Sequence, residues 1–267
     1  MNETDFQSYL ETAQNAALLG GDLNRAAFRE AKHQTATKGQ SVVNMVTETD
    51  RTTETAIRRF ISERFPDHRF MGEELGTDDR KLEGPLWVID PIDGTSNFIH
   101  GFPHYSVSVG FAVDGEMQVA ACLDVERNEM FTATIGKGAF LDGTPIRCST
   151  VGNLSEALVM TGFYYDRGSM MEKTLSAIRS LFAAGIHGIR RSGSAVLDIA
   201  WVAAGRHDAF FEFELSPWDF APAALIARES GARTSDIFGN PLPLNSSTVV
   251  VANGNLMNDI CSILQKC

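Results

Sequence analysis

The chain has 267 residues, of which 43% are hydrophobic, and it carries a formal net charge of −11 at pH 7. This length and composition are enough to bury a sizeable core in one large domain or in two closely joined ones. The negative balance and the lack of a run of basic residues argue against direct binding to the backbone of nucleic acids, which requires clustered Lys and Arg.

The N-terminal segment MNETDFQSYL has neither the basic start nor the apolar stretch of a secretory signal, and no later segment has the apolar length that crosses a bilayer. We therefore expect a cytoplasmic protein without a membrane span. The cysteines are scattered along the chain and form no C-x-x-C pair, which favours reduced thiols over a zinc site or a disulfide framework.

An amphipathic helix is predicted at the start of the chain. Thr4 and Gln7 form a capping-box signature, and apolar residues then recur at helical spacing as far as Gly20 and Gly21, where we expect the helix to end. Residues 30–44 are mostly polar and predict a connecting loop.

A second helix is predicted from about Thr49. Along it Asp50, Ile57 and Ile61 fall on one face. Asp50 should therefore point inward although it is charged.

Strands follow the second helix. HRFMGEE and LWVID are typical of strands, and SVSVGFAV, EMQVAACLDV and NEMFTATI predict an antiparallel meander with GKGAFLDGT as a further hairpin. In the second half, strands are expected at LSEALVMTG, HGIR, DAFFEFE and VVVAN, and helices at TLSAIRSLFAA, SAVLDIAWVAAG, APAALIARESG and LMNDICSIL. Strand clusters interleaved with helices indicate an α/β chain with layered, mixed sheets.

Acidic side chains gather at the ends of two predicted strands. Glu73 and Glu74 follow one strand, and Asp90 and Asp93 follow the other. A proline after Asp90 biases it to an extended conformation and Gly94 permits a sharp turn, so the two aspartates can converge. Carboxylates crowded at a partly buried site are compensated by hard divalent cations such as Mg²⁺. A simple capped turn that opens the segment SNFIH is the alternative.

Asp219, in SPWDFAPAALIARESG, is a further candidate. Ser216 and Asp219 could form only a capping box, with Pro217 at the first helical position. Pro222 is tolerated best in a first turn, which favours a helix start nearer Asp219 and would put its carboxylate at the helix mouth.

Two more residues have both a structural and a functional interpretation. Ser194, in RRSGSAVLDIA, could cap a helix or could border a site for substrate hydroxyls. Glu212, in DAFFEFE, is expected to be an exposed strand acid unless that strand edge faces the same cleft.

The sequence lacks the motifs of several enzyme classes: G-x-x-x-x-G-K-[ST], G-x-G-x-x-G after a strand, H-E-x-x-H and G-x-S-x-G. His100 and His104 are four positions apart, but Pro103 lies between them. Because proline disfavours a helical metal-binding face, they are interpreted as loop residues.

The segments GEE, WVIDPIDGTSNF and WDFAPAALIARESGA, in this order, closely resemble the inositol monophosphatase family, and the likeness extends to VTETD, FTATIGKGAFLDG and HGIRRSGSA. The resemblance implies one domain over residues 1–267, a layered α-β-α-β-α sandwich of the inositol monophosphatase and fructose-1,6-bisphosphatase type. Its N-terminal half, residues 1–150, would hold a large antiparallel sheet, and residues 151–267 would form an α/β half. Members are Mg²⁺-dependent, lithium-sensitive phosphomonoesterases and commonly homodimers.

The same resemblance implies roles for individual residues. The expected ligands of two or three Mg²⁺ ions are Glu73, Asp90, the carbonyl of Ile92, Asp93 and Asp219. The expected catalytic residues are Thr95, which helps to activate the attacking water, its acidic partner Asp50, and Glu73. The expected substrate contacts are Asp93, Gly94, Thr95, Gly193, Ser194, Ala195, Glu212 and Asp219. Lys38 is a weaker correspondence in a loop that aligns poorly.

Some positions depart from the family pattern. Asn44 stands where many members have Asp, which makes a loop contact doubtful but does not affect the metal site. Ser96 replaces a common Thr but keeps a hydroxyl. Pro222 is unusual for the animal enzymes.

The resemblance implies hydrolysis of a myo-inositol monophosphate without a phosphoenzyme. Ser96 follows Thr95 where nucleotide and histidinol phosphate relatives commonly carry Lys, which favours the inositol branch. Alternative substrates are fructose 1,6-bisphosphate, histidinol phosphate, 3′-phosphoadenosine 5′-phosphate and NADP. An alternative of another class is a protein-binding role with RNA polymerase factors, for which the acidic balance favours a protein partner over RNA.

Overall fold

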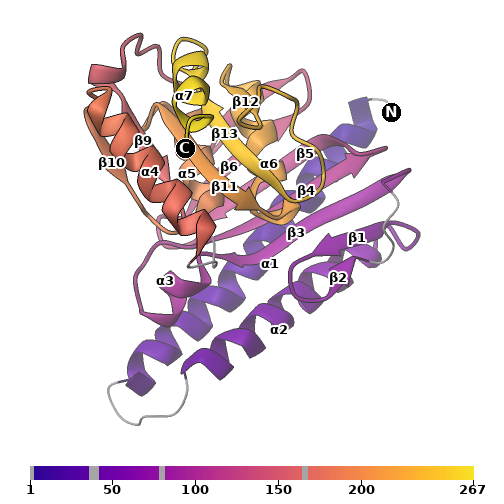
Figure 1. The fold of residues 1–267 in the computed structure, drawn as a ribbon. Coiled ribbons are helices and arrows are strands. Elements are labelled where there is room, and N and C mark those ends of the chain that lie inside the picture. The colour runs from indigo at the N-terminus through magenta and orange to yellow at the C-terminus, as the bar shows by residue number, and fades with distance from the viewer. Residues whose placement is uncertain (1–2, 36–41, 78–81, 164–167) are drawn as a thin grey trace.

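The computed structural model describes residues 3–35, 42–77, 82–163 and 168–267, and within them the side chains outside residues 3–4 and 31–47 (Figure 1). The helices are α1 (Glu3–Thr35), α2 (Val42–Ser62), α3 (Thr95–Ile99), α4 (Ser169–Ala183), α5 (Ala195–Ala203), α6 (Pro217–Glu229), α7 (Met257–Leu264) and a 3₁₀ turn at Leu154–Glu156. The strands of the first half are β1 (Arg69–Gly72), β2 (Gly76–Thr77), β3 (Pro85–Asp93), β4 (Ser106–Val113), β5 (Glu116–Asp124), β6 (Glu129–Thr134), β7 (Gly138–Leu141) and β8 (Thr144–Pro145). Those of the second half are β9 (Leu158–Thr161), β10 (Gly188–Arg190), β11 (Ala209–Leu215), β12 (Arg233–Ser235) and β13 (Ser247–Ala252).

The elements stack in five layers, which confirms the expected α-β-α-β-α sandwich (Figure 1). Helices α1 and α2 pack on one face of a sheet in the order β2-β1-β3-β4-β5-β6-β7-β8. Helices α5 and α6 fill the space between this sheet and a second one, in the order β10-β9-β11-β13-β12, and α4 and α7 cover the outer face of the second sheet. Because the sheets are covered on both faces, their strands are apolar along most of their length.

The predicted meander is confirmed, since β3 to β8 pair as consecutive antiparallel neighbours, and β1 joins β3 in parallel. Among the described residues, no helix is both long enough and apolar enough to span a bilayer.

The predicted end of the first helix is wrong. Helix α1 continues through Gly20 and Gly21 to Thr35, and α2 begins at Val42 rather than near Thr49. Glycine usually weakens a helix, but a Cβ at Gly21 would lie 2.4 Å from Leu123 Cδ2 on β5, so the missing side chain is what allows the helix to lie close on the sheet.

The longer α1 also reaches the end of β3. Its buried Asn24 donates from Nδ2 to the Pro91 carbonyl at 2.7 Å and accepts a hydrogen bond from Thr53 of α2 at 2.8 Å. Both N-terminal helices are therefore fixed to the segment that carries Asp90 and Asp93.

The predicted start of the sixth helix is also wrong. Helix α6 begins at Pro217, with Ser216 as its N-cap and a capping box to Asp219, so Pro222 lies inside the helix. Pro222 has room because it packs over Gly110 of β4, where a Cβ would lie 2.9 Å from the proline Cγ.

Candidate active site

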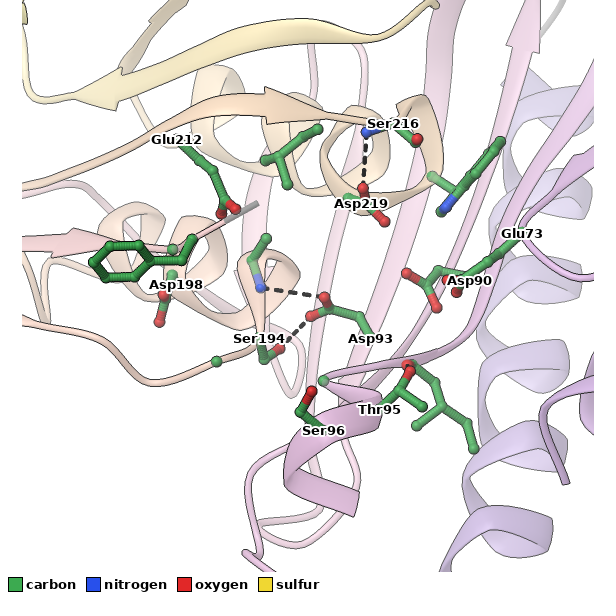
Figure 2. A pocket seen from close by; sticks show the side chains of 18 of the residues that line it. Glu73, Asp90, Asp93, Thr95, Ser96, Ser194, Asp198, Glu212, Ser216 and Asp219 are labelled. Atoms are coloured by element: carbon green, nitrogen blue, oxygen red, sulfur yellow. Dashed lines mark hydrogen bonds between the residues drawn. The ribbon is translucent and has the colours of Figure 1, made fainter. Parts of the chain in front are cut away.

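A cavity of about 210 Å³ opens between the end of β3, the N-termini of α5 and α6, and the end of β11 (Figure 2). Apart from Asp50, and from Lys38 outside the described residues, the residues expected at the site all line it: Glu73, Asp90, Ile92, Asp93, Gly94, Thr95, Gly193, Ser194, Ala195, Glu212 and Asp219. Figure 2 shows Glu73 and Asp90 on one side, Glu212 and Asp198 on the other, and Asp93 between them.

A β-bulge explains how Asp90 and Asp93 reach the same cavity. In a regular strand, residues three apart point to opposite faces. The pairing of β3 with β4 shifts between these residues, because Asp90 pairs with Ser108 whereas Asp93 pairs with Ser106. The extra residue on β3 re-aims one side chain, so both carboxylates border the cavity.

Asp93 is surrounded by hydrogen-bond donors. The hydroxyls of Ser194 and Ser106 donate to its Oδ2, the second at 3.2 Å. From the first turn of α5, the N–H of Ala195 donates to Oδ1 at 3.2 Å and that of Val196 to Oδ2 at 3.0 Å. Burial raises the pKa of Asp93 to about 6, and these donors limit the rise. The site thus uses a helix N-terminus to hold a carboxylate.

Ser194 has two functions in this arrangement. It is the N-cap of α5, because its Oγ accepts the N–H of Leu197 at 3.3 Å, as the capping interpretation predicts. The same hydroxyl donates to Asp93. The helix cap and the acidic site therefore share one side chain.

Asp90 and Asp50 are in the opposite situation. Oδ1 of each is buried and has no hydrogen-bond partner among the described residues. Burial, followed by the charge of Glu73, raises the pKa of Asp90 well above its usual value, and burial raises that of Asp50 to about 8, with Glu74 and Glu54 adding to the shift. Asp50 is buried as its helical spacing predicts, but it does not line the cavity.

Mutual repulsion extends to the other acids of the cavity. Burial and then the charge of Asp219 raise the pKa of Glu73 to about 8, and burial and the charge of Asp93 raise that of Asp219 to about 7. Such crowding is relieved either by protonation or by a bound cation.

The donor set fits magnesium better than zinc. Among the described residues, no three Asp, Glu, His or Cys side chains form a ready cage for one ion. Mg²⁺ does not require one, because it usually keeps several waters and binds through one or two carboxylates and substrate phosphate oxygens. The unpartnered Oδ1 of Asp90 and the carboxylates of Glu73 and Asp219 around the same cavity are suitable oxygen ligands.

The turn after Asp93 leads directly into α3. Gly94 is the N-cap with φ of 97°, and a Cβ there would lie 3.1 Å from the His104 carbonyl, so both conformation and space favour glycine. Thr95 donates from Oγ1 to the Ile92 carbonyl at 3.0 Å. That carbonyl, an expected metal ligand, keeps a second lone pair.

Asp219 and Glu212, from the second half of the chain, both border the cavity. Asp219 accepts the N–H of Ser216 at 2.8 Å, so the capping interpretation is confirmed, and its carboxylate also borders the cavity. Glu212 is buried, which corrects the expectation of an exposed strand acid. Gly162 of the neighbouring chain segment leaves space for it, because a Cβ there would lie 1.9 Å from Glu212 Oε2.

Sequence reasoning missed several residues around the cavity. Asp198 is buried in the first turn of α5, accepts a hydrogen bond from Ser192 and borders the cavity with Arg191. Asn97 of α3 donates to the carbonyls of His104 at 2.7 Å and Ser192 at 2.9 Å and so connects two loops. For Asp198 the available signal was a polar residue within an apolar helical pattern, as for Asp50, whereas the short segment TSNFI gives no such signal for Asn97.

Other predicted features lie away from the cavity or outside the described part. Lys38 and the side chain of Asn44 lie outside the described residues. His104 is buried and His100 is exposed, and neither lines the cavity. The four cysteines, Cys122, Cys148, Cys261 and Cys267, are free thiols, as predicted.

The chain is similar in sequence and in fold to several known proteins. The model of the inositol monophosphatase family matches residues 5–267. The chain is 40% identical over 265 residues to the Nus factor SuhB of Pseudomonas aeruginosa, covering 97% of this chain and 96% of that protein. It is 38% identical over 252 residues to inositol monophosphatase 2 of Homo sapiens, covering 93% and 87%. The solved inositol monophosphatase of Anabaena has a TM-score of 0.87 at 31% identity, covering 98% of this chain and 97% of that one.

Proposed function

The chain belongs to the inositol monophosphatase family, and we propose on that basis that it is a Mg²⁺-dependent phosphomonoesterase that hydrolyses a myo-inositol monophosphate to inositol and phosphate. The observation that carries the proposal is the group of buried carboxylates around one cavity, in which Asp90 has an unpartnered oxygen. Negative charge gathered in this way would repel a phosphate unless cations were bound there.

Two or three ions would be held by the oxygens of Glu73, Asp90, Ile92, Asp93 and Asp219. When bound, Mg²⁺ lowers the pKa of water and stabilises the negative charge of a phosphate and its leaving oxygen. The position of the cavity at the start of α3 supports a role for the backbone N–H groups of Gly94 and Thr95 as phosphate donors.

We assign the orientation of the attacking water to Thr95, with Asp50 as its acidic partner. The Thr95 hydroxyl, which donates to the Ile92 carbonyl, can accept a hydrogen bond from the attacking water and orient it. Asp50 is buried on α2 and does not line the cavity, and it would act on the water through Thr95. Direct attack of water on phosphorus needs no phosphoenzyme.

Substrate hydroxyls would meet the opposite wall of the cavity. The proposed acceptors are Glu212, on that wall, and Asp93 and Asp219, which also border the cavity; Gly193, Ser194 and Ala195 form the rim at the start of α5. Ser96 leaves a neutral hydroxyl beside the phosphate end. This lining suits a small phosphorylated polyol or sugar better than a large anion, and fructose 1,6-bisphosphate, histidinol phosphate, 3′-phosphoadenosine 5′-phosphate and NADP are the competing substrates.

A direct test measures phosphate release from myo-inositol 1-phosphate and these four competitors in excess Mg²⁺, for wild type, Asp93→Asn and Thr95→Ala. We expect the inositol ester to have the highest kcat/KM and each variant to lose about 10²-fold or more. Release by both variants at the wild-type rate would overturn the assignment. The same preparations would test lithium inhibition and a homodimer in solution, both of which the family resemblance implies. The cytoplasmic location expected from the N-terminal sequence would be tested by fractionation of cells that express the chain.

A second candidate function is favoured by the similarity to a protein named Nus factor SuhB. In this role the chain would bind a protein partner among RNA polymerase factors, alongside catalysis. The test is binding of the purified chain to RNA polymerase and its factors by wild type and Asp93→Asn in parallel. Binding that survives the loss of phosphate release would separate the two functions, and no binding by either form would exclude the second.

A further inference from the structure

A buried carboxylate behind the cavity contacts the turn that carries Glu73. The side chain of Glu54, on α2 one helical turn after Asp50, has an exposed fraction of 0%. Its Oε2 accepts the N–H groups of Glu74 at 2.8 Å and Leu75 at 3.3 Å. A charged acceptor for two consecutive backbone donors connects the helix firmly to the turn.

Arg58 completes this contact. Its Nη2 lies 2.7 Å and its Nε 2.8 Å from Glu54 Oε1, and Nη2 also donates to the carbonyl of Gly76. The pair therefore satisfies both donors and an acceptor of the same turn. Because Arg58 and two amides surround the carboxylate, the cost of burying its charge is offset.

Gly72 is fitted to the same contact. A Cβ at Gly72 would lie 2.1 Å from Glu54 Oε1 and 2.6 Å from its Cδ. Gly72 is absent from the residues with positive φ, so space rather than backbone conformation requires glycine here. The glycine before Glu73 thus leaves room for a carboxylate that comes from α2.

We propose that Glu54 is a positioning residue that fixes the turn of residues 72–76 and thereby sets where the Glu73 carboxylate stands in the cavity. The inference rests on the proposed function in one respect, that Glu73 is a Mg²⁺ ligand. Without Glu54, the N–H groups of Glu74 and Leu75 would form hydrogen bonds with water instead. The turn would be less fixed, and each binding cation would have to order the Glu73 side chain. Partners that orient metal ligands in this way typically contribute 10- to 100-fold to metal affinity or activity.

The experiment compares Glu54→Gln and Gly72→Ala with a matched control, Glu63→Gln. Glu63 directly follows the last residue of α2 and also pairs with an arginine four residues away, but both side chains of that pair are largely exposed. Amide hydrogen exchange of Glu74 and Leu75 is measured by NMR in the metal-free proteins. Titration with MgCl₂ then gives the Mg²⁺ dissociation constant, and phosphate release gives kcat at saturating Mg²⁺.

In Glu54→Gln and Gly72→Ala we expect exchange about 10-fold faster at both amides and Mg²⁺ binding about 10-fold weaker or more, with kcat at saturating Mg²⁺ within about 3-fold of wild type. Glu63→Gln should match wild type throughout. Unchanged exchange, or faster exchange with unchanged Mg²⁺ binding, would overturn the inference. If Glu54→Gln does not fold, Gly72→Ala decides, because it keeps the charge of Glu54. Exchange and Mg²⁺ binding do not require turnover, so they remain decisive even if the wild type releases no phosphate.

Discussion

Asp90 and Asp93 lie three residues apart on β3 and border the same cavity, yet their carboxylates differ in the hydrogen-bond donors that surround them. Asp93 accepts bonds from the hydroxyls of Ser194 and Ser106 and from two N–H groups of α5. Asp90 is 1% exposed and has an oxygen with no partner among the described residues. Their pKa values follow, because that of Asp93 rises only to about 6 whereas that of Asp90 rises well above its usual value.

The difference separates two kinds of acidic side chain. Asp93 can carry its charge in the protein alone, since a helix N-terminus compensates it. Oδ1 of Asp90 lacks such a partner among the described residues, so its charge is relieved only by a proton or by a bound cation. The donors around Asp93 therefore offset much of the cost of burying its charge, whereas Oδ1 of Asp90 has no such compensation among the described residues.

The largest effect should come from exchanging each aspartate for asparagine. Asp90→Asn should lower kcat/KM by about 10³-fold, because a metal ligand contributes several kcal/mol to charge stabilisation. In the metal-free protein, however, it should leave the free energy of unfolding unchanged or higher, since it removes a repelled, unpartnered charge. Asp93→Asn should lower both, the stability by about 2 kcal/mol, because an amide NH₂ would face the donors of α5. Chemical denaturation and phosphate release measure the two quantities.

The contrast between Asp90 and Asp93 is tested by the sign of the change in the metal-free free energy of unfolding, because both substitutions are expected to lower activity. Equal destabilisation of the metal-free protein by both substitutions would show that Asp90 also has donors that compensate its charge. Asp114→Asn is a useful control, because Asp114 lies in the exposed turn between β4 and β5 and its carboxylate accepts only the N–H of Gly84 among the hydrogen bonds described.

The next effect is a dependence of metal-free stability on pH. The folded pKa values of Asp50, Glu73 and Glu212 rise to about 8 and that of Asp219 to about 7, above their unfolded values. The folded state therefore binds more protons than the unfolded state between about pH 5 and 8, and stability falls as pH rises through this window. We expect the metal-free melting temperature to drop by about 5 °C or more across it.

Excess Mg²⁺ should remove most of this dependence, because bound cations replace the protons and are favoured as pH rises. Melting curves at several pH values, with EDTA and with Mg²⁺, provide the measurement. Glu73→Gln should flatten the metal-free curve, whereas Glu63→Gln should not. A metal-free melting temperature that stays constant or rises between about pH 5 and 8 would contradict the mutual repulsion of these acids.

Much of the fold and of the site could be predicted from local sequence signals. Strand and helix periodicity located most elements, and the inward face of α2 identified Asp50 as unusual. The proline and glycine around Asp90 and Asp93 indicated that the two carboxylates could converge. Resemblance in GEE, WVIDPIDGTSNF and WDFAPAALIARESGA then added the distant residues Glu73 and Asp219 to the same site.

The remaining features depend on packing between segments far apart in the sequence. Gly21 looks like a helix end because glycine costs about 1 kcal/mol in a helix, but contact with Leu123 on β5 outweighs that preference. Glu54 looks like an ordinary surface acid of a helix, and only the position of the turn at residues 72–76 explains its burial. The bulge on β3 is likewise invisible in the sequence, because it is defined by the pairing with β4.

Ser194→Ala should have an intermediate effect, since it removes a donor of Asp93 together with the cap of α5. Loss of the cap costs about 1 kcal/mol, and we expect a total destabilisation of about 2 kcal/mol and a loss of about 10-fold in kcat/KM. With fewer donors, the pKa of Asp93 should rise, which moves the acidic limb of the pH–rate profile to higher pH. Ser192→Ala is the control, because that hydroxyl donates to Asp198 instead. An unchanged acidic limb would mean that Asp93 does not depend on this hydroxyl.

The smallest effect is expected from Ser106→Ala, which tests whether the donors of Asp93 are equivalent. Ser106 donates to Oδ2 at 3.2 Å from β4, whereas Ser194 and the two N–H groups belong to the start of α5. Without Ser106 the helix terminus still faces the carboxylate, so we expect less than about 1 kcal/mol of destabilisation and at most about a 3-fold change in kcat/KM. Denaturation and pH–rate profiles measured beside Ser194→Ala give the comparison. Equal losses in the two variants would mean that the two serine hydroxyls, rather than the N–H groups of α5, compensate the charge of Asp93. The difference between Asp93 and Asp90 would then be due to neighbouring side chains and not to the position of the helix N-terminus.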